Sequence, residues 1–264
     1  MKNFFLRSEN KIINRFIKDG FLIFDIKKKK ELNNVKKQVS NLSKKLLKAK
    51  KIIDIEKIHN HLQFNELNKF RLKIYSELNK SNSFQSNYYS LGREYLDIIC
   101  GNELVMQRKV NLSIQMPNDD SSLLPLHSDV WSGCSPFEVV LWVPLVNCKK
   151  TQSMFILPKK INDYYYKNMK RFNSVSEIER KVKNKVKWLN LKYGQGLIFL
   201  HSIMHGNMVN EEKNTRWSFN CRFKSVFSPY DDKSIGETFL PITIRPASAS
   251  GMQYMEPKVK NARF

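Results

Sequence analysis

Apolar residues in the first third of the chain recur at the spacing of amphipathic helices. Steps of three and four residues place such residues on one stripe of a helix. Two stripes of this kind are present: Leu32, Val35, Val39, Leu42 and Leu46, and then Leu67, Phe70, Ile74 and Leu78. A third, short helix is predicted from Tyr88 to Cys100, so we expect residues 1–103 to form a helical N-terminal part.

The period of the pattern changes near residue 104. From Val110 to Met116 every second residue is apolar, and the residues between are Asn111, Ser113 and Gln115. A period of two predicts a strand with one apolar and one polar face. The polar face either meets water or looks inward to a site, and both orientations stay open from the pattern. We favour the inward one, since this strand leads into the motif described below.

Further apolar runs predict a barrel-type body. Residues 137–145 are almost continuously apolar, as in a central buried strand, and other strands are expected at 154–157, 197–205 and 216–223. A length of 264 residues with 41% hydrophobic content suits one domain with a sizeable core. We therefore expect a single domain over 1–264, with its β core at 104–227 and a C-terminal segment, 228–264, that wraps the barrel.

A long segment without strand character interrupts this core at residues 159–193. It contains three consecutive tyrosines and a capping-box pattern that begins at Ser176. An excursion of this length inside a compact barrel is usually a lid or a substrate wall. Its basic residues either hold a phosphate of the substrate or form a solvated face: Lys159, Lys160, Lys167, Lys170 and Arg171.

The segment His127-Ser128-Asp129 carries the most specific chemistry. A histidine and a carboxylate two residues apart, joined by a distant second histidine, can occupy one face of an octahedral Fe(II) ion. Two histidines, His201 and His205, are candidates for the distal ligand, and strand alternation cannot choose between them. We favour His205 because it lies eleven residues before Arg216, across a turn-forming stretch. A guanidinium fork there would match a co-substrate carboxylate.

These residues resemble the motifs of a known family. His127-Ser128-Asp129, His205 and Arg216-Trp217-Ser218 are similar to the HxD…H and RxS elements of the Fe(II)/2-oxoglutarate-dependent oxygenases, in the phytanoyl-CoA-dioxygenase-like branch. Residues 14–24 are similar to the opening helix, glycine stop and first strand of that branch. Residues 127–145 resemble oxygenases of bacterial carbohydrate and aminocyclitol gene clusters.

The resemblance implies a fold, a reaction and a set of roles. The fold is a double-stranded β-helix, or jelly roll, that is mainly β and has N-terminal helices packed on it. His127, Asp129 and His205 would bind Fe(II). Arg216 and Ser218 would hold 2-oxoglutarate, and O2 would be the second co-substrate. The substrate would be a small polar molecule, which we expect to be a sugar, an aminocyclitol or a sugar nucleotide.

Several residues near the predicted metal ligands lie outside the family motifs and are candidates for further contacts. Gln115 and Asn111 are candidates for co-substrate contacts, with solvated surface polarity as the alternative. Trp131, Ser132 and Asn207 stand beside the metal ligands in the sequence and are assigned to substrate binding. The same chemistry on another small metabolite or on a lipid stays open. A non-catalytic jelly-roll protein that binds polyanions stays open as a different class of function.

The formal net charge of +22 raises the question of a nucleic-acid partner. Residues 1–80 hold 21 basic and 8 acidic side chains, so the excess is concentrated away from the predicted site. The lysines there alternate with a helical apolar stripe and not with aromatic residues, which indicates a solvated helix face. We expect no nucleic-acid partner.

The remaining composition indicates a cytoplasmic protein. No apolar run approaches the roughly 20 residues of a membrane span, and residues 1–15 are too polar for a secretory signal. Cys100, Cys134, Cys148 and Cys221 lie far apart and are predicted to be free thiols. His59 and His61, two residues apart on a predicted helix, point in different directions and cannot share a metal ion. The oligomeric state cannot be deduced from these patterns.

Overall fold

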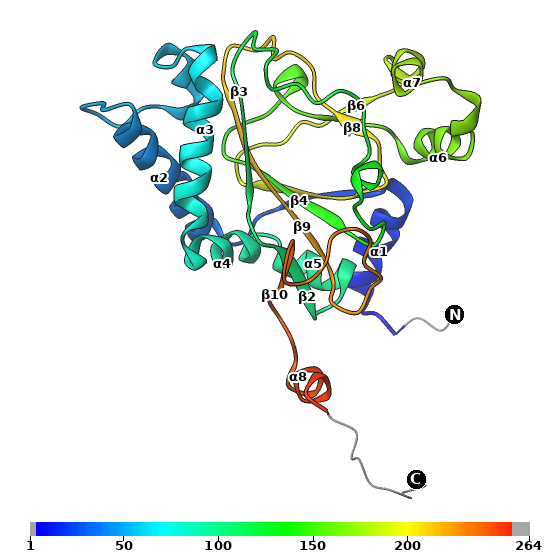
Figure 1. Ribbon diagram of the computed structural model, residues 1–264. Helices are drawn as coiled ribbons and strands as arrows, with labels where there is room; N and C mark the ends of the chain where they lie inside the picture. The colour runs from blue at the N-terminus through cyan, green and yellow to red at the C-terminus, as the bar shows by residue number, and fades with distance from the viewer. Residues whose placement is uncertain (1–3, 255–264) are drawn as a thin grey trace, which may run out of the picture.

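The computed structural model describes residues 4–254, which form two antiparallel sheets and a set of covering helices (Figure 1). The larger sheet has the order β1-β7-β4-β9-β2-β10, with β3 also paired to β9, and the smaller sheet has the order β6-β5-β8. The strands are β1 (Phe21–Asp25), β2 (Leu104–Gln107), β3 (Asn111–Gln115), β4 (Val139–Pro144), β5 (Phe155–Ile156), β6 (Lys187–Trp188), β7 (Gln195–Leu200), β8 (His205–Gly206), β9 (Arg216–Ser225) and β10 (Phe239–Pro241). This arrangement, with helices added, is the predicted jelly roll.

The α-helices lie mainly before β2 and within the insertion. They are α1 (Arg7–Asp19), α2 (Lys29–Leu46), α3 (Phe64–Asn79), α4 (Asn82–Ser90), α5 (Arg93–Cys100), α6 (Lys159–Lys167), α7 (Val175–Val182) and α8 (Pro246–Met252). Short 3-10 turns are η1 (Ile55–Asn60), η2 (Asp129–Ser132), η3 (Lys150–Gln152) and η4 (Met169–Arg171). The apolar stripes predicted for residues 32–46 and 67–78 form the buried faces of α2 and α3.

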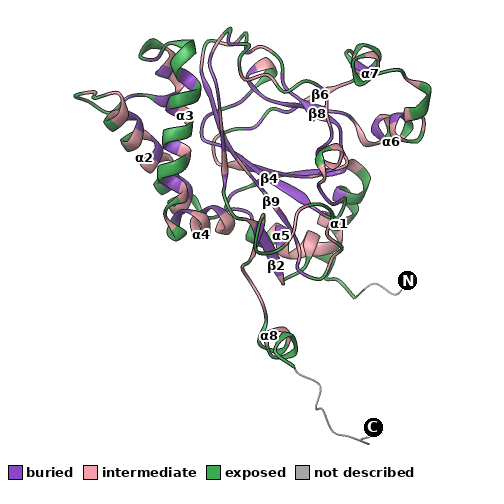
Figure 2. Cartoon of the chain, in the orientation of Figure 1, coloured by how far each residue is buried: buried purple, intermediate pink, exposed green. Residues whose placement is uncertain are grey.

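One hydrophobic core joins the N-terminal helices to the larger sheet. Strand β9 alternates between the two sides of this sheet, and its odd-numbered residues face the helices. Trp217 packs edge-on against Phe70 of α3, and Phe219 packs edge-on against Phe84 and Tyr88 of α4. Burial is concentrated in these strands and on the inner faces of the helices (Figure 2).

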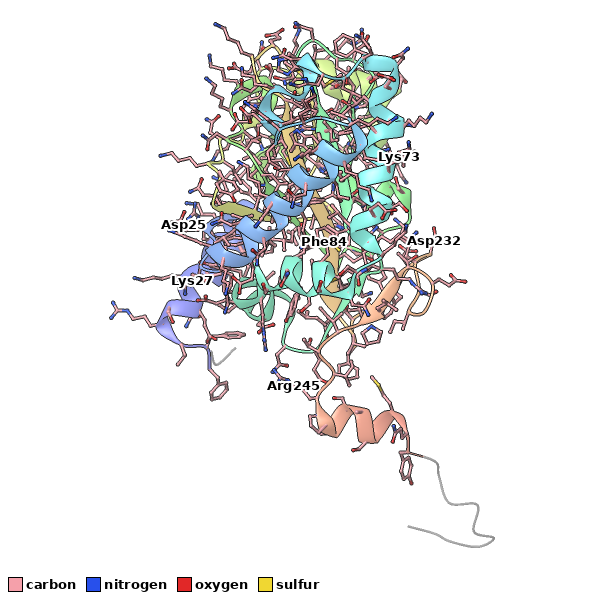
Figure 3. The ribbon with its side chains drawn as sticks, turned by 90° about the vertical axis from the view of Figure 1, so that its left-hand side faces the viewer. Asp25, Lys27, Lys73, Phe84, Asp232 and Arg245 are labelled. Carbon is pink, nitrogen blue, oxygen red and sulfur yellow. The ribbon has the colours of Figure 1, made fainter. Side chains whose placement is uncertain are left out.

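The outer faces of the same helices carry the basic residues. Seen from the left-hand side of Figure 1, α2 and α3 lie in front of the sheet, with Lys73 pointing away from the body and Phe84 within it (Figure 3). Lys73 is exposed, whereas Phe84 is fully buried. The placement agrees with the solvated helix face expected for the N-terminal excess of lysine.

The helix predicted from Tyr88 to Cys100 is wrong as a single element. The chain breaks after Ser90 and restarts at Arg93, which gives the two helices α4 and α5. Gly92 lies so close to β4 that a Cβ atom there would stand 2.9 Å from both methyl carbons of Leu141. Close packing against a strand that lies far along the sequence therefore sets the break.

Two further expectations need correction. The N-cap of α7 is Ser174, whose hydroxyl accepts from the Glu177 amide, so the capping box expected from Ser176 is wrong. The C-terminal segment does not wrap the barrel over its described length, because β10 pairs with the sheet edge at β2 and α8 then projects away from the body (Figure 1). Arg245 lies at the start of α8, and residues 255–264 fall outside the described residues.

Two other sequence predictions can be compared with the described residues. All four cysteines are free. Among residues 4–254, no helix is long and apolar enough to cross a membrane.

Candidate metal centre

The structure brings His127, Asp129 and His205 together between the two sheets. His127 and His205 form an antiparallel bridge in which each backbone amide donates to the other's carbonyl, at 2.9 and 2.8 Å. Asp129 follows as the first residue of η2. One potential ligand atom from each of the three side chains lies within 4.8 Å of the other two.

Backbone carbonyls set the orientation of both imidazoles. Nδ1 of His127 lies 2.8 Å from the Pro125 carbonyl, and Nδ1 of His205 lies 2.9 Å from the Ile203 carbonyl. A carbonyl can only accept, so each Nδ1 carries the proton and donates it. Each Nε2 then keeps its lone pair for a metal, which is the usual role of such outer contacts around a ligating histidine.

Asp129 is held ionised beside these rings. Arg222 donates to its Oδ1 at 3.0 Å. Burial opposes the charge of this carboxylate, but His205, Arg222 and His201 together lower the pKa of Asp129 below its usual value. Burial also lowers the pKa of His205 to about 4, so this ring is neutral and able to ligate at neutral pH.

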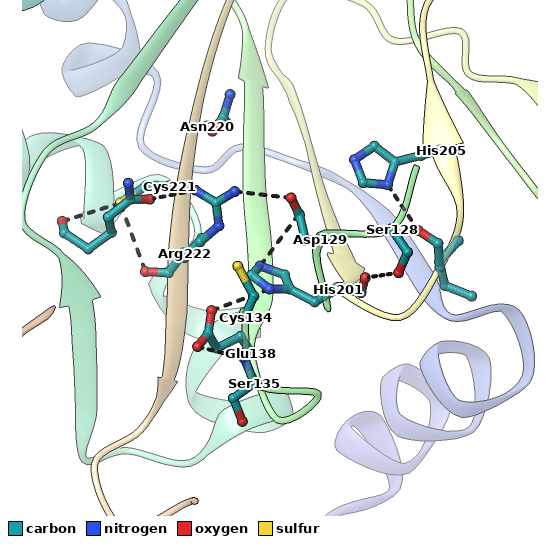
Figure 4. Close-up of polar contacts among 12 residues, drawn as sticks. Ser128, Asp129, Cys134, Ser135, Glu138, His201, His205, Asn220, Cys221 and Arg222 are labelled. Carbon is teal, nitrogen blue, oxygen red and sulfur yellow. Dashed lines mark hydrogen bonds and ion pairs between the residues drawn. The ribbon is translucent and has the colours of Figure 1, made fainter. Parts of the chain in front are cut away.

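Ser128, between the two ligands, anchors the segment from behind. Its hydroxyl donates to the His201 carbonyl at 2.7 Å (Figure 4). The same hydroxyl accepts a hydrogen bond from the Tyr166 hydroxyl of α6. Because Ser128 points away from the ligands, the flanking His127 and Asp129 side chains share the other side of the chain. The insertion therefore contributes to the site by supporting the ligand segment.

His201 takes a different place from His205. Its ring is fully buried, with Nε2 3.8 Å from Oδ2 of Asp129 and Nδ1 3.3 Å from Oε2 of Glu138 (Figure 4). It is not among the three residues that could share an ion with His127. Burial lowers the pKa of His201 to about 3.

A cavity of about 730 Å³ opens beside the three ligands. Asn111 and Ser113 of β3 line it, as do Arg216, Asn220 and Arg222 of β9, so the polar face of β3 looks inward. Asn111 donates to Asn220 at 3.2 Å, and Arg216 donates from Nη2 to the Ser113 hydroxyl at 3.0 Å. Arg216, Asn220 and Arg222 of β9 thus face the cavity, while Trp217 and Phe219 face the helices.

Other residues singled out from the sequence lie outside this lining. Gln115 is fully buried and donates its side-chain amide to the Met208 carbonyl at 2.6 Å. Ser218 is also fully buried, and its hydroxyl has no hydrogen-bond partner among the described residues. The ring centroids of Trp131 and Tyr166 of α6 lie 6.1 Å apart, and Ser132 is exposed.

Asn207 does line the cavity, but its amide is engaged with backbone. It accepts from the Leu124 amide at 2.5 Å and donates to the Ser122 carbonyl at 3.3 Å, so it shapes the rim formed by residues 121–124.

The cavity wall that the sequence interpretation missed comes from α3. Asn65, Asn68 and Arg71 of this helix line the cavity together with Phe64. No residue of the insertion 159–193 does so, which contradicts its predicted role as a substrate wall. The polar face of α3 is visible in the sequence, but helical periodicity does not tell whether such a face meets water or a cavity.

The residues present fit the group that the motif implies. Two imidazole nitrogens and one carboxylate on one side of a cavity form the donor set of non-haem Fe(II) centres. Arg216 is 4% exposed, makes no ion pair with the described residues, and leaves its Nε without a hydrogen-bond partner. A buried guanidinium in that state is suited to receive the carboxylate of a small molecule.

No known protein family and no curated protein matches the sequence. Solved structures do match. A nickel complex of the non-haem monooxygenase ThoJ has a TM-score of 0.51 and 14% identity, over 95% of this chain and 89% of that one. AviO1 from Streptomyces viridochromogenes Tue57 has a TM-score of 0.54 and 12% identity, over 86% and 99% of the two chains.

HygX from Streptomyces hygroscopicus, solved with nickel and 2-oxoglutarate bound, has a TM-score of 0.50 and 12% identity over 86% of this chain and 89% of its own. The chain therefore shares the fold of these solved structures, a jelly roll with added helices.

Proposed function

We propose that this protein is an Fe(II)- and 2-oxoglutarate-dependent oxygenase. The observation that carries the proposal is the grouping of His127, Asp129 and His205, with both Nε2 lone pairs free, in the wall of a cavity that Arg216 also lines. Asp129 supplies the third protein ligand, which favours hydroxylation or further oxidation over halogenation, because a halide would need that position.

The positions of the residues support a proposed role for each. His127, Asp129 and His205 would hold Fe(II), and Arg222 keeps Asp129 ionised and oriented through its bond to Oδ1. Arg216, with Ser113 bonded to it, would receive the distal carboxylate of 2-oxoglutarate. Ser218 lies on the same face of β9 and is the proposed hydroxyl donor to that carboxylate. The bound metal with 2-oxoglutarate would activate O2 and release succinate and CO2.

A carbohydrate-derived substrate is supported by the polar part of the cavity wall, which stands beside apolar residues such as Leu112, Trp142 and Phe199. Amides and hydroxyls from three elements line it: Asn65 and Asn68 of α3, Asn111 and Ser113 of β3, and Asn220 of β9. Short hydrogen-bonding side chains of this kind suit a polyhydroxylated ring, whereas a lipid chain would require an apolar wall. Arg71 adds a positive charge on the α3 side, which would favour an anionic group on the substrate.

The test is co-substrate turnover by purified protein loaded with Fe(II). Succinate formation is measured with sugars, aminocyclitols, sugar nucleotides, an acyl-CoA and free amino acids, and His205→Ala serves as the inactive control. We expect stimulation by a member of the first three classes. Stimulation by acyl-CoA alone would replace the carbohydrate assignment, and an absence of 2-oxoglutarate binding to metal-loaded protein would remove the oxygenase assignment itself.

The free thiols support a cytoplasmic location.

A further inference from the structure

A second group of metal-ligating side chains lies behind Asp129, away from the cavity. Cys134, Glu138 and His201 offer a thiol, a carboxylate and an imidazole, and one ligand atom from each lies within 4.8 Å of the other two (Figure 4). All three side chains belong to fully buried residues. None of them lines the cavity of the first site, so the function proposed above does not account for them.

Two of the three side chains, Glu138 and His201, carry buried atoms with no hydrogen-bond partner among the described residues. Oε2 of Glu138 and both ring nitrogens of His201 are buried and unpaired among the described residues, although Nδ1 stands only 3.3 Å from that carboxylate oxygen. The other oxygen of Glu138, Oε1, accepts from the Ser135 amide at 3.2 Å. Burying polar atoms without partners is costly, so the facing pair of Nδ1 of His201 and Oε2 of Glu138 points to a bound cation between them.

Neither tautomer of a neutral His201 ring satisfies both of its neighbours. With the proton on Nδ1, the lone pair of Nε2 faces Oδ2 of Asp129 at 3.8 Å. With the proton on Nε2, the lone pair of Nδ1 faces Oε2 of Glu138 at 3.3 Å. A cation bound by Nδ1 and Glu138 removes the conflict, because Nε2 then carries the proton and directs it toward Asp129.

We propose that Cys134 Sγ, Glu138 Oε2 and His201 Nδ1 form a second metal site, of the zinc class. Thiolate, imidazole and carboxylate together are donors that Zn²⁺ accepts in tetrahedral sites. With zinc–ligand distances near 2.0–2.1 Å, nitrogen and oxygen ligands of a tetrahedral ion lie about 3.3 Å apart. The observed separation of Nδ1 and Oε2 is 3.3 Å.

Lys233 supports the ligating form of Cys134. Burial raises the pKa of the Cys134 thiol, and the Lys233 ammonium, which donates to Sγ at 2.6 Å, acts against this by stabilising the thiolate that binds metal. The thiolate and the Glu138 carboxylate would together balance the charge of a divalent ion. The proposed site also connects to the first one, since a metal-bound His201 that points Nε2–H at Asp129 has the carboxylate–histidine–metal arrangement found around structural and catalytic ions.

The test is titration of metal-free, full-length protein with Co²⁺, which reports thiolate ligation through a near-ultraviolet charge-transfer band. We expect two equivalents to bind, one of them with this band, and Zn²⁺ to displace the band. Cys134→Ser should lose the band and one equivalent. Cys148→Ser, the matched control at another buried free thiol, should keep both.

His127→Ala separates the two sites. It should lose the equivalent bound at the first site and keep the thiolate band, so failure of the oxygenase proposal would leave this signal intact. Folded wild-type protein that binds Co²⁺ without a thiolate band overturns the second site, whatever the stability of the variants. Retention of the band in folded Cys134→Ser overturns the ligand assignment.

Discussion

Replacing Arg216 by Leu separates a structural role of this residue from a role in binding. The guanidinium is 4% exposed, donates to the Ser113 hydroxyl at 3.0 Å and the Ser153 carbonyl at 3.4 Å, and has no ion-pair partner among the described residues. Burial lowers the pKa of Arg216 from 12.5 to about 10, which corresponds to roughly 3 kcal/mol against the charged form. The two hydrogen bonds that the charged guanidinium donates each stabilise the folded state by about 1.5 kcal/mol. These contributions nearly cancel, so the free energy of unfolding of the metal-free variant should lie within about 1–2 kcal/mol of wild type.

Binding of 2-oxoglutarate should respond much more strongly. Loss of a charge-assisted pair worth about 1.5–3 kcal/mol weakens affinity roughly ten- to a hundredfold. At a ligand concentration of about 100 Kd, binding stabilises wild type by about 2.7 kcal/mol, and a hundredfold weaker Kd leaves about 0.4 kcal/mol. Arg216→Lys should recover part of the difference, because an ammonium lacks the bidentate fork.

The assay is urea unfolding of Zn²⁺-loaded protein with and without 2-oxoglutarate. Equal stabilisation of wild type and Arg216→Leu would contradict the assignment and transfer the role to Arg222. A loss of more than about 3 kcal/mol in the variant without ligand would show instead that the buried charge is part of the fold.

Three further changes have clear expected outcomes. His205→Ala should abolish Fe(II) binding at the first site, whereas His201→Ala should keep it. Iron content and the visible band of the Fe(II)–2-oxoglutarate chelate distinguish the two variants. The reverse result would make His201, and not His205, the distal metal ligand. Because burial lowers the pKa of His205 to about 4 and of His201 to about 3, the unfolded chain takes up protons below about pH 6.5 that the folded metal-free chain does not. Stability should therefore be full above this pH and fall below it, by up to about 1.4 kcal/mol per pH unit for each histidine, and urea unfolding that is constant between pH 7 and 5 would refute the shifts. Tyr88→Phe removes a buried 2.7 Å hydrogen bond to the Leu141 carbonyl and should cost about 1–2 kcal/mol by the same method, whereas an unchanged midpoint would show that the bond contributes nothing.

Sequence patterns predicted the parts of this protein that local geometry decides. Alternation along β3 indicated its two faces, and the spacing of Asp129 from His127 suffices to place two ligands on one side of an extended segment. Distant contacts decided the rest. The break at Gly92 depends on Leu141 in a strand that follows much later, and the polar face of α3 meets a cavity whose other wall is β9.

The surroundings of His201 were also inaccessible from the sequence. This residue is fully buried, and nothing in the local pattern indicates that Glu138 and Asp129 lie on either side of its ring. Such neighbours arise only when β4, β7 and η2 pack together.

The two-sided character of β9 has a consequence for engineering the substrate range. A library of changes in this strand would alter co-substrate contacts and helix packing at once, because Arg216 and Trp217 are adjacent residues with opposite surroundings. Asn65 and Asn68 face the same cavity from the surface of α3, where both residues are exposed. Directed evolution should therefore find altered selectivity with little loss of folding yield on that helix, and seldom on the strand opposite.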